Sequence, residues 1–344
     1  YLEKNDYPLA LQHYDSALQI YQSIDSPYGA FWCYLSIGII QKNSGHFQQA
    51  FDTYEKALSI ARERNDEQGI ADSYNNMGNV LKKQGRWALA ADYYEKALTT
   101  YRKLGAEMRI SDCLNNEGDI FYFTGHYSTA LEKYMKSLSI VSLAGDPYRE
   151  IMRNNNIAET LIAMGKHDEA LDYFNTALSL AEQLNDKLQL AEAYSNLGQY
   201  FRKNEDPLQA AAYFQKALKM SQETGNVNIE ASVNNMLAAC FAAQGRYILA
   251  MDHALNALRM ARKSGASYEL MSALHNQYTI YEALGDEEKA LHSFKEYVLI
   301  KDSLASIKQK SRLEELALRE KTELAKKEVT RLQNDISSLK AIID

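Results

Sequence analysis

Residues 70–98 read IADSYNNMGNVLKKQGRWALAADYYEKAL, and one glycine, Gly85, separates two helical patterns in this stretch. Before Gly85, apolar side chains recur at steps of three and four residues, at Ile70, Tyr74, Met77 and Leu81. After it, the same spacing continues at Ala90, Tyr94 and Ala97. Such spacing places side chains on one face of an α-helix, and glycine commonly ends a helix. The stretch therefore predicts two helices joined by a short turn.

The same pattern returns every 40 residues along the chain. One small-residue position recurs in eight copies, at Ala10, Ala50, Ala90, Ala130, Ala170, Ala210, Ala250 and Ala290. A second position follows seven residues later, and only Ser137 and Tyr297 interrupt its alanines. A 40-residue unit is too small to bury its own apolar face, so stacking of neighbouring units must complete the core. We therefore expect an all-α solenoid of antiparallel helix pairs.

The composition agrees with a helical chain and argues against several other classes. Four prolines and 16 glycines in 344 residues are few for the turns of a sandwich or barrel. The 38 Lys and Arg residues against 45 Asp and Glu give a net charge of -7, which opposes broad phosphate binding. No run approaches the roughly 20 apolar residues of a membrane span. We expect no nucleic-acid partner for this region and no membrane segment in this chain.

The sequence contains no motif for catalysis or for a metal. Cys33, Cys113 and Cys240 are too scattered for a metal cage and are expected to be small buried hydrophobes. The chain lacks a G-x-x-x-x-G-K phosphate loop, a G-x-S-x-G elbow and an H-E-x-x-H zinc pair. We therefore predict no catalytic residue, no metal and no cofactor, and no enzyme activity in this fragment.

The repeat resembles the tetratricopeptide repeat family. Members of that family carry Leu-Gly on the first helix and Ala, an aromatic residue and Ala on the second, which are matched here by Met77-Gly78, Ala90, Tyr94 and Ala97. The period of 40, rather than the commoner 34, is similar to the long-helix variety of kinesin light chains and bacterial peptide-sensing regulators. The resemblance implies a right-handed superhelical solenoid over residues 1–300, with one partial unit and seven helix pairs.

The first helices of such a solenoid line its concave wall, and here they carry many amides and carboxylates. The candidate binding residues are Asp72, Asn75, Asn76, Asn79, Asp112, Asn115, Asn116, Asp119, Asn155, Asn156, Glu159, Glu192, Asn196, Gln199 and Arg202. A side-chain amide both donates and accepts hydrogen bonds. A ladder of amides is therefore suited to hold the backbone of an extended peptide without selecting its side chains.

Two interpretations of these residues stay open. One column of asparagines has a structural alternative, namely hydrogen bonds to the adjoining unit: Asn76, Asn116, Asn156, Asn196 and Asn276. The column of Asn75, Asn115 and Asn155 favours ligand contact. The acids outnumber the cations of the groove, which favours a basic or polar protein or peptide segment over an acidic C-terminal tail. The alternative for the acids is a solvated helix face.

Residues 301–344 carry a different pattern. From Leu318 the apolar residues fall into a heptad, and those expected in the seam are Leu318, Val329, Leu332, Ile336, Leu339 and Ile343. Beta-branched residues at the a positions and mostly leucine at d favour a parallel two-stranded coil. We therefore expect a long C-terminal helix that forms a coiled coil and joins two chains in a parallel homodimer.

The segment that leaves the array resembles bacterial sensor proteins. Residues 298–304 and 312–316 are similar to regions in which a tetratricopeptide array feeds a coiled coil, often a membrane helix, and then a histidine kinase or DNA-binding output domain. The resemblance implies a sensor or regulatory input module of a bacterial signalling protein. The alternative is a scaffold without signalling, and an output domain beyond residue 344 would favour the sensor. The compartment is left open between cytoplasm and periplasm, as is membrane attachment of the full-length protein.

The dimer is tested by light scattering on the whole chain and on a chain that lacks residues 303–344. We expect the whole chain to show about twice its monomer mass of 39.1 kDa, because the heptad seam supplies the contact. The shortened chain should then be a monomer. The same association state for both would exclude the tail as the dimer contact.

Overall fold

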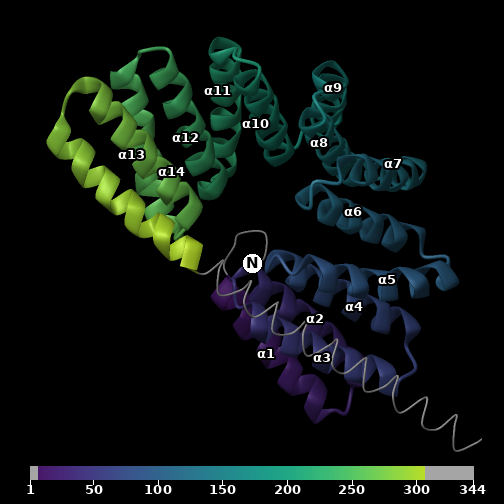
Figure 1. Ribbon diagram of the computed structural model, residues 1–344. Helices are drawn as coiled ribbons and strands as arrows, with labels where there is room; N and C mark the ends of the chain where they lie inside the picture. Colours follow the sequence, from purple (N-terminus) through teal and green to yellow (C-terminus); the bar gives the residue numbers. More distant parts are fainter. Residues whose placement is uncertain (1–6, 307–344) are drawn as a thin grey trace, which may run out of the picture.

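The computed structural model describes residues 7–306, which form an arc of stacked antiparallel helices (Figure 1). The second helix of the partial first unit is α1 (Tyr7–Ser23). Six pairs follow: α2 (Pro27–Asn43) with α3 (Phe47–Glu63), α4 (Glu67–Lys83) with α5 (Trp87–Leu104), α6 (Glu107–Phe123) with α7 (Tyr127–Ala144), α8 (Pro147–Ala163) with α9 (His167–Leu184), α10 (Lys187–Lys203) with α11 (Pro207–Thr224), and α12 (Val227–Ala243) with α13 (Tyr247–Ser264). In the seventh pair, α14 (Ser267–Leu284) precedes a helix at 287–306.

This arrangement confirms the predicted all-α solenoid. The predicted coiled-coil residues, Leu318 to Ile343, lie outside the described residues, and the helix at 287–306 continues across the predicted domain boundary at residue 300. Among residues 7–306, no helix combines the length and the apolar character that a membrane crossing requires.

The turns recur every 20 residues, and each contains one residue with positive φ. These residues are Asp25, Gly45, Asn65, Gly85, Gly105, Gly125, Gly145, Gly165, Asn185, Glu205, Gly225, Gly245, Gly265 and Gly285. Positive φ is easiest for glycine, and short polar side chains tolerate it better than most others. Each 40-residue unit is therefore two helix-and-turn segments of equal length, which sets the same stagger for every pair.

A small residue on the first helix and a ring on the second helix form the core of the first five pairs; Ala254 replaces the ring in the sixth pair and Tyr278 replaces the small residue in the seventh. A Cβ on Gly78 would lie 2.6 Å from Cε1 of Tyr94. The ring of Tyr94 is fully buried there. The group that approaches Gly78 so closely is the ring of the same pair. The contact fixes how far the first helix is rotated, and therefore which of its residues face inward.

The hydroxyl of that ring has a partner in some units and not in others. Tyr94 donates to Oδ1 of Asn79, and Tyr134 donates to Oδ1 of Asp119, both at 2.8 Å. The Tyr54 hydroxyl is buried without a partner among the described residues. The residue 15 positions before Tyr54, where its acceptor would be, is Ile39.

Replacing Tyr54 and Tyr94 by phenylalanine should have opposite effects on stability. Tyr54→Phe should leave the free energy of unfolding unchanged or raise it, because a buried hydroxyl without a partner costs about 1–3 kcal/mol. Tyr94→Phe should lower it by about 1 kcal/mol, because Asn79 loses its bond. Urea unfolding followed by circular dichroism measures both. Equal losses would mean that the Tyr54 hydroxyl has a partner in solution.

Candidate functional site

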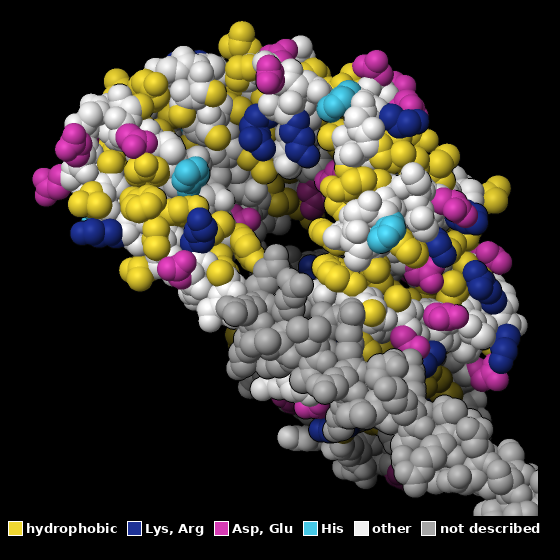
Figure 2. All heavy atoms as spheres, viewed as in Figure 1, with side chains coloured by type: hydrophobic (Ala, Val, Ile, Leu, Met, Phe, Trp, Pro, Cys, Tyr) yellow, Lys and Arg dark blue, Asp and Glu magenta, His cyan; other side chains and the backbone are white. Residues whose placement is uncertain are grey.

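The concave side of the arc contains a cavity of about 650 Å³ between α4, α6, α8 and α10. Figure 2 shows the hollow within the arc, with acidic and apolar side chains on its walls. Ten of the predicted binding residues line this cavity: Asn75, Asn79, Asp112, Asn115, Asn116, Asn155, Asn156, Glu159, Glu192 and Asn196. The wall therefore comes from the first helix of four successive pairs.

Three other predicted residues take part in packing. Asp72 is only 5% exposed and accepts a hydrogen bond of 2.6 Å from the hydroxyl of Tyr101, with Nε of Arg109 at 3.5 Å. Burial raises the pKa of Asp72, although Tyr101 and Arg109 oppose the shift. Asn76 donates to the backbone oxygen of Asp72 in its own helix. Asp119 is held by the Tyr134 hydroxyl and by Nζ of Lys82.

Two predicted residues lie on α10 outside the first cavity. Gln199 is not part of its wall. Arg202 lines a second cavity, of about 470 Å³, together with His275 and Asn276. The predicted binding residues that face a cavity are thus divided between two cavities on the concave side.

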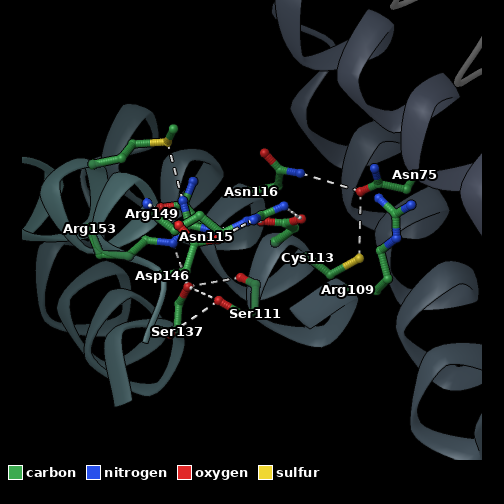
Figure 3. Close-up of polar contacts among 12 residues, drawn as sticks. Asn75, Arg109, Ser111, Cys113, Asn115, Asn116, Ser137, Asp146, Arg149 and Arg153 are labelled. Carbon is green, nitrogen blue, oxygen red and sulfur yellow. Dashed lines mark hydrogen bonds and ion pairs between the residues drawn. The ribbon is translucent and has the colours of Figure 1, made fainter. Parts of the chain in front are cut away.

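Asparagines of successive units bond to one another across the wall. Nδ2 of Asn116 donates to Oδ1 of Asn75 at 3.3 Å, and Nδ2 of Asn156 donates to Oδ1 of Asn115 at 2.8 Å. Figure 3 shows the first of these bonds. The same contact returns between Asn276 and Asn235. The structural interpretation of the second asparagine column is therefore correct for Asn116, Asn156 and Asn276.

The ladder is interrupted between α8 and α10. By the same spacing, Asn196 should donate to Asn155, but Oδ1 of Asn155 is buried without a partner among residues 7–306. No hydrogen bond joins the Asn196 side chain to another described residue. Since buried polar atoms are nearly always bonded, an unpaired acceptor in a cavity wall marks a position for a donor from outside.

Two carboxylates beside this interruption also lack close cations. Within the described residues, no Lys or Arg forms an ion pair with Glu159 or Glu192. Both side chains are exposed on the concave surface, and partial loss of water there raises the pKa of both carboxyls. For Glu159 the more distant Lys203 opposes this rise and Asp119 adds to it, while Asp186 adds to it for Glu192.

The repeat explains why these two acids are unpaired. The cation of the equivalent Asp119 is Lys82, 37 residues earlier, and the residue 37 positions before Glu159 is Tyr122. The residue equivalent to Tyr134, which gives its hydroxyl to Asp119, is Phe174. Asp112 is paired with Arg149, 37 residues further along, at 3.1 Å. The residue 37 positions after Glu192 is Ile229. Both acids thus keep the position of a paired acid but have lost the partner.

A buried arginine, Arg153, forms part of the cavity wall and was missed by the sequence analysis. It is 2% exposed and occupies a position that other units fill with small residues such as Cys113 and Ala193. Its Nε donates to Oγ of Ser137 at 2.7 Å, and its Nη2 lies 2.8 Å from Oδ1 of Asp112. Ser137 is one of the two interruptions in the alanine series. The arginine at a position of small residues and the serine at a position of alanines could together have predicted this contact from the sequence.

Other residues of the wall were also missed. The hydroxyls of Ser111 and Ser137 lie 2.8 Å apart and join α6 to α7 beside Arg153 (Figure 3). Tyr148 and Met152 line the cavity and are each 51% exposed, so they offer apolar surface beside the polar groups. Arg149, Ile151, Arg153 and Gln189 complete the wall.

Stacked helix pairs whose first helices build a concave wall define a helical-repeat binding protein. A family model described as tetratricopeptide repeat matches residues 1–63, 69–142 and 148–223, and a second model of that description matches residues 195–266. The chain therefore belongs to the tetratricopeptide repeat family. A model of anaphase-promoting complex subunit 5 matches residues 239–303. A search of curated protein sequences finds no match.

Solved structures share this fold at low sequence identity. The apo form of the quorum sensor NprR from B. thuringiensis is 16% identical, with a TM-score of 0.65 over 87% of this chain and 84% of that one. A Rap protein complexed with competence and sporulation factor is 17% identical, with a TM-score of 0.60 over 87% and 86%. The Rap conjugation gene regulator of plasmid pLS20, in complex with a Phr peptide, is 16% identical, with a TM-score of 0.63 over 83% and 77%.

Removing either partner of the Asp112–Arg153 pair should have unequal effects. Asp112→Asn should lower the free energy of unfolding by about 3 kcal/mol, because it leaves a buried guanidinium without an anion. Arg153→Met should cost no more than about 1 kcal/mol, because the Asp112 side chain is 26% exposed and keeps Arg149.

Urea unfolding of the two variants and of the double variant tests this asymmetry. Arg153→Met added to Asp112→Asn should recover most of the lost stability, since the unpaired charge is then gone. Equal losses for the two single variants would show that packing, and not the buried charge, determines the effect.

Proposed function

We propose that the chain is a peptide-binding module whose concave cavity captures an extended, polar or basic peptide segment. The observation that carries the proposal is the interruption of the asparagine ladder. Oδ1 of Asn155 lacks a donor, the Asn196 amide is unbonded, and Glu159 and Glu192 lack cations, all in the wall of one cavity. Each of these groups is complementary to a different part of a basic peptide.

The amides fit a peptide backbone. An extended chain presents one N–H and one C=O per residue. Oδ1 of Asn155 can accept a hydrogen bond from a peptide N–H. The side-chain amide of Asn196 can accept from a peptide N–H or donate to a peptide C=O. The cavity volume of about 650 Å³ lies in the usual range for ligand sites. Tyr148 and Met152 provide apolar contact for a peptide side chain.

The carboxylates fit a cationic side chain or a free amino group. Loss of water raises the pKa of Glu159 and Glu192, so their charged forms are disfavoured in the free protein. A ligand cation in the cavity would favour these charged forms again. An anionic ligand would add repulsion, which favours a basic peptide over an acidic one.

The role we propose for this module is the input domain of a bacterial signalling protein, with a histidine kinase or DNA-binding output and a C-terminal coiled coil as the relay. The likeness in fold to a quorum sensor and to two Rap proteins solved with a peptide or factor supports this role. A scaffold is the alternative, and it would bind its partner with no effect on the association of the tail.

Charge selection is tested with an array of seven-residue peptides in which Lys and Arg replace Asp and Glu at matched positions. Basic peptides should bind more tightly to the whole chain, and the tightest is then titrated by fluorescence anisotropy. Glu159→Gln combined with Glu192→Gln should weaken it about tenfold, which corresponds to about 1.4 kcal/mol. Asn155→Ala should weaken basic and neutral peptides alike, because it removes a backbone contact.

Glu169→Gln is the matched control, because it removes the same charge from an exposed position on α9. It should leave the affinity unchanged. Binding should also weaken as the pH falls through the pKa values of Glu159 and Glu192, which lie above the ordinary value for Glu of about 4.3. Tighter binding of acidic peptides, or full affinity in the double glutamine variant, would contradict the proposal.

A further inference from the structure

A third cavity, of about 510 Å³, lies at the junction between the α4–α5 pair and the α6–α7 pair. Its wall includes Trp87, Ala91 and Leu98 of α5 and Ile120 and Phe121 of α6. None of its residues belongs to the concave cavity. The two cavities use different faces of α6, so this site is independent of the proposed function.

The repeat shows why this space is open. At the preceding junction, the rings of Phe51 and Tyr93 lie edge to face with their centroids 5.9 Å apart. The residues 40 positions further along are Ala91 and Lys133, and both line the cavity. Lys133 is paired with Glu117 at 2.6 Å. The cavity is therefore the place where one junction lacks the aromatic pair that fills its neighbour.

The mouth of the cavity is aromatic and exposed. The ring of Trp87 stacks on Phe123, with centroids 5.2 Å apart and planes at 15°. Phe123 is 63% exposed although it is a large apolar residue. The charges at the cavity balance, since Glu95 and Glu117 face Arg102 and Lys133. These features favour an uncharged ring over an ion.

We propose that this cavity binds an aromatic side chain presented by a partner protein. The chain itself shows that the space takes a ring, because Phe51 and Tyr93 occupy the equivalent positions one unit earlier. The exposed Phe123 lies beyond the ring site, so a polypeptide that carries the ring would cover it where a free small molecule would not. The ring would lie against Trp87, and the residues flanking it would lie against Phe123.

Trp87 provides the signal for a binding test. The chain has two tryptophans, so Trp32→Phe leaves Trp87 as the only one. N-acetylphenylalanine amide serves as the probe and N-acetylalanine amide as its control. The phenylalanine probe should change Trp87 fluorescence saturably, with a dissociation constant in about the millimolar range expected for so small a ligand. Heptapeptides with a central phenylalanine should include members that bind at least about tenfold tighter.

Filling the cavity should abolish this binding. Ala91→Phe with Lys133→Tyr rebuilds the pair seen at the preceding junction and should weaken the probe more than about tenfold. Ala91→Leu is the second variant, since Leu131 occupies the next equivalent position. Asn155→Ala, in the concave cavity, should leave probe binding unchanged. A failure of this aromatic site can therefore be told apart from a failure of the proposed peptide site in the concave cavity. The site is contradicted if the alanine probe changes Trp87 fluorescence as much as the phenylalanine probe does, or if the phenylalanine probe binds the filled variants equally well. The protein partner is contradicted if no heptapeptide binds more tightly than N-acetylphenylalanine amide.

Discussion

The structure depends on one contact, in which a ring on the second helix of a pair packs against a small residue on the first. Tyr94 meets Gly78 so closely that even a methyl group there would collide with it. The contact fixes the rotation of the first helix in the first five pairs, and the 20-residue spacing of the turns repeats that geometry along the chain. Which side chains reach the concave wall therefore follows from the core of the pair.

Because the units are alike, a departure from the repeat shows where a unit has a particular role. Arg153 is buried at a position of small residues, and Ser137 accepts its hydrogen bond where other units have alanine. Tyr122 and Ile229 have replaced the cations that would pair with Glu159 and Glu192. These departures gather around α8 and α10, near the wall of the 650 Å³ concave cavity, where the asparagine ladder also stops.

The sequence predicted the helix pairs, their stacking and most of the concave wall, because a fixed period identifies equivalent positions without any knowledge of contacts. It did not predict that Asp72 is buried, because the hydroxyl that donates a hydrogen bond to Asp72 belongs to Tyr101 on the next helix. Bonds between units were one of the two interpretations of the asparagine column, but the pattern did not identify their partners. Asn116 and Asn75 are 41 residues apart, and the period alone does not say which amide of the next unit is within reach. A comparison of separations of 37 and 41 residues for paired polar types would have found both the ion pairs and the ladder.

The unpaired acids are exposed on the concave surface, so solvent screens their charges and keeps their cost in stability small. A carboxyl whose pKa is raised by folding stabilises the folded state below the pKa of the unfolded chain, and this contribution is lost as the pH rises through the folded value. Glu159 and Glu192 therefore lose this contribution as the pH rises through their raised pKa values. Asp112 differs because Arg149 and Arg153 accompany it. A wall designed only for stability would pair the other two acids in the same way. Acids left without cations beside a free amide are better explained by a ligand that supplies the missing charge.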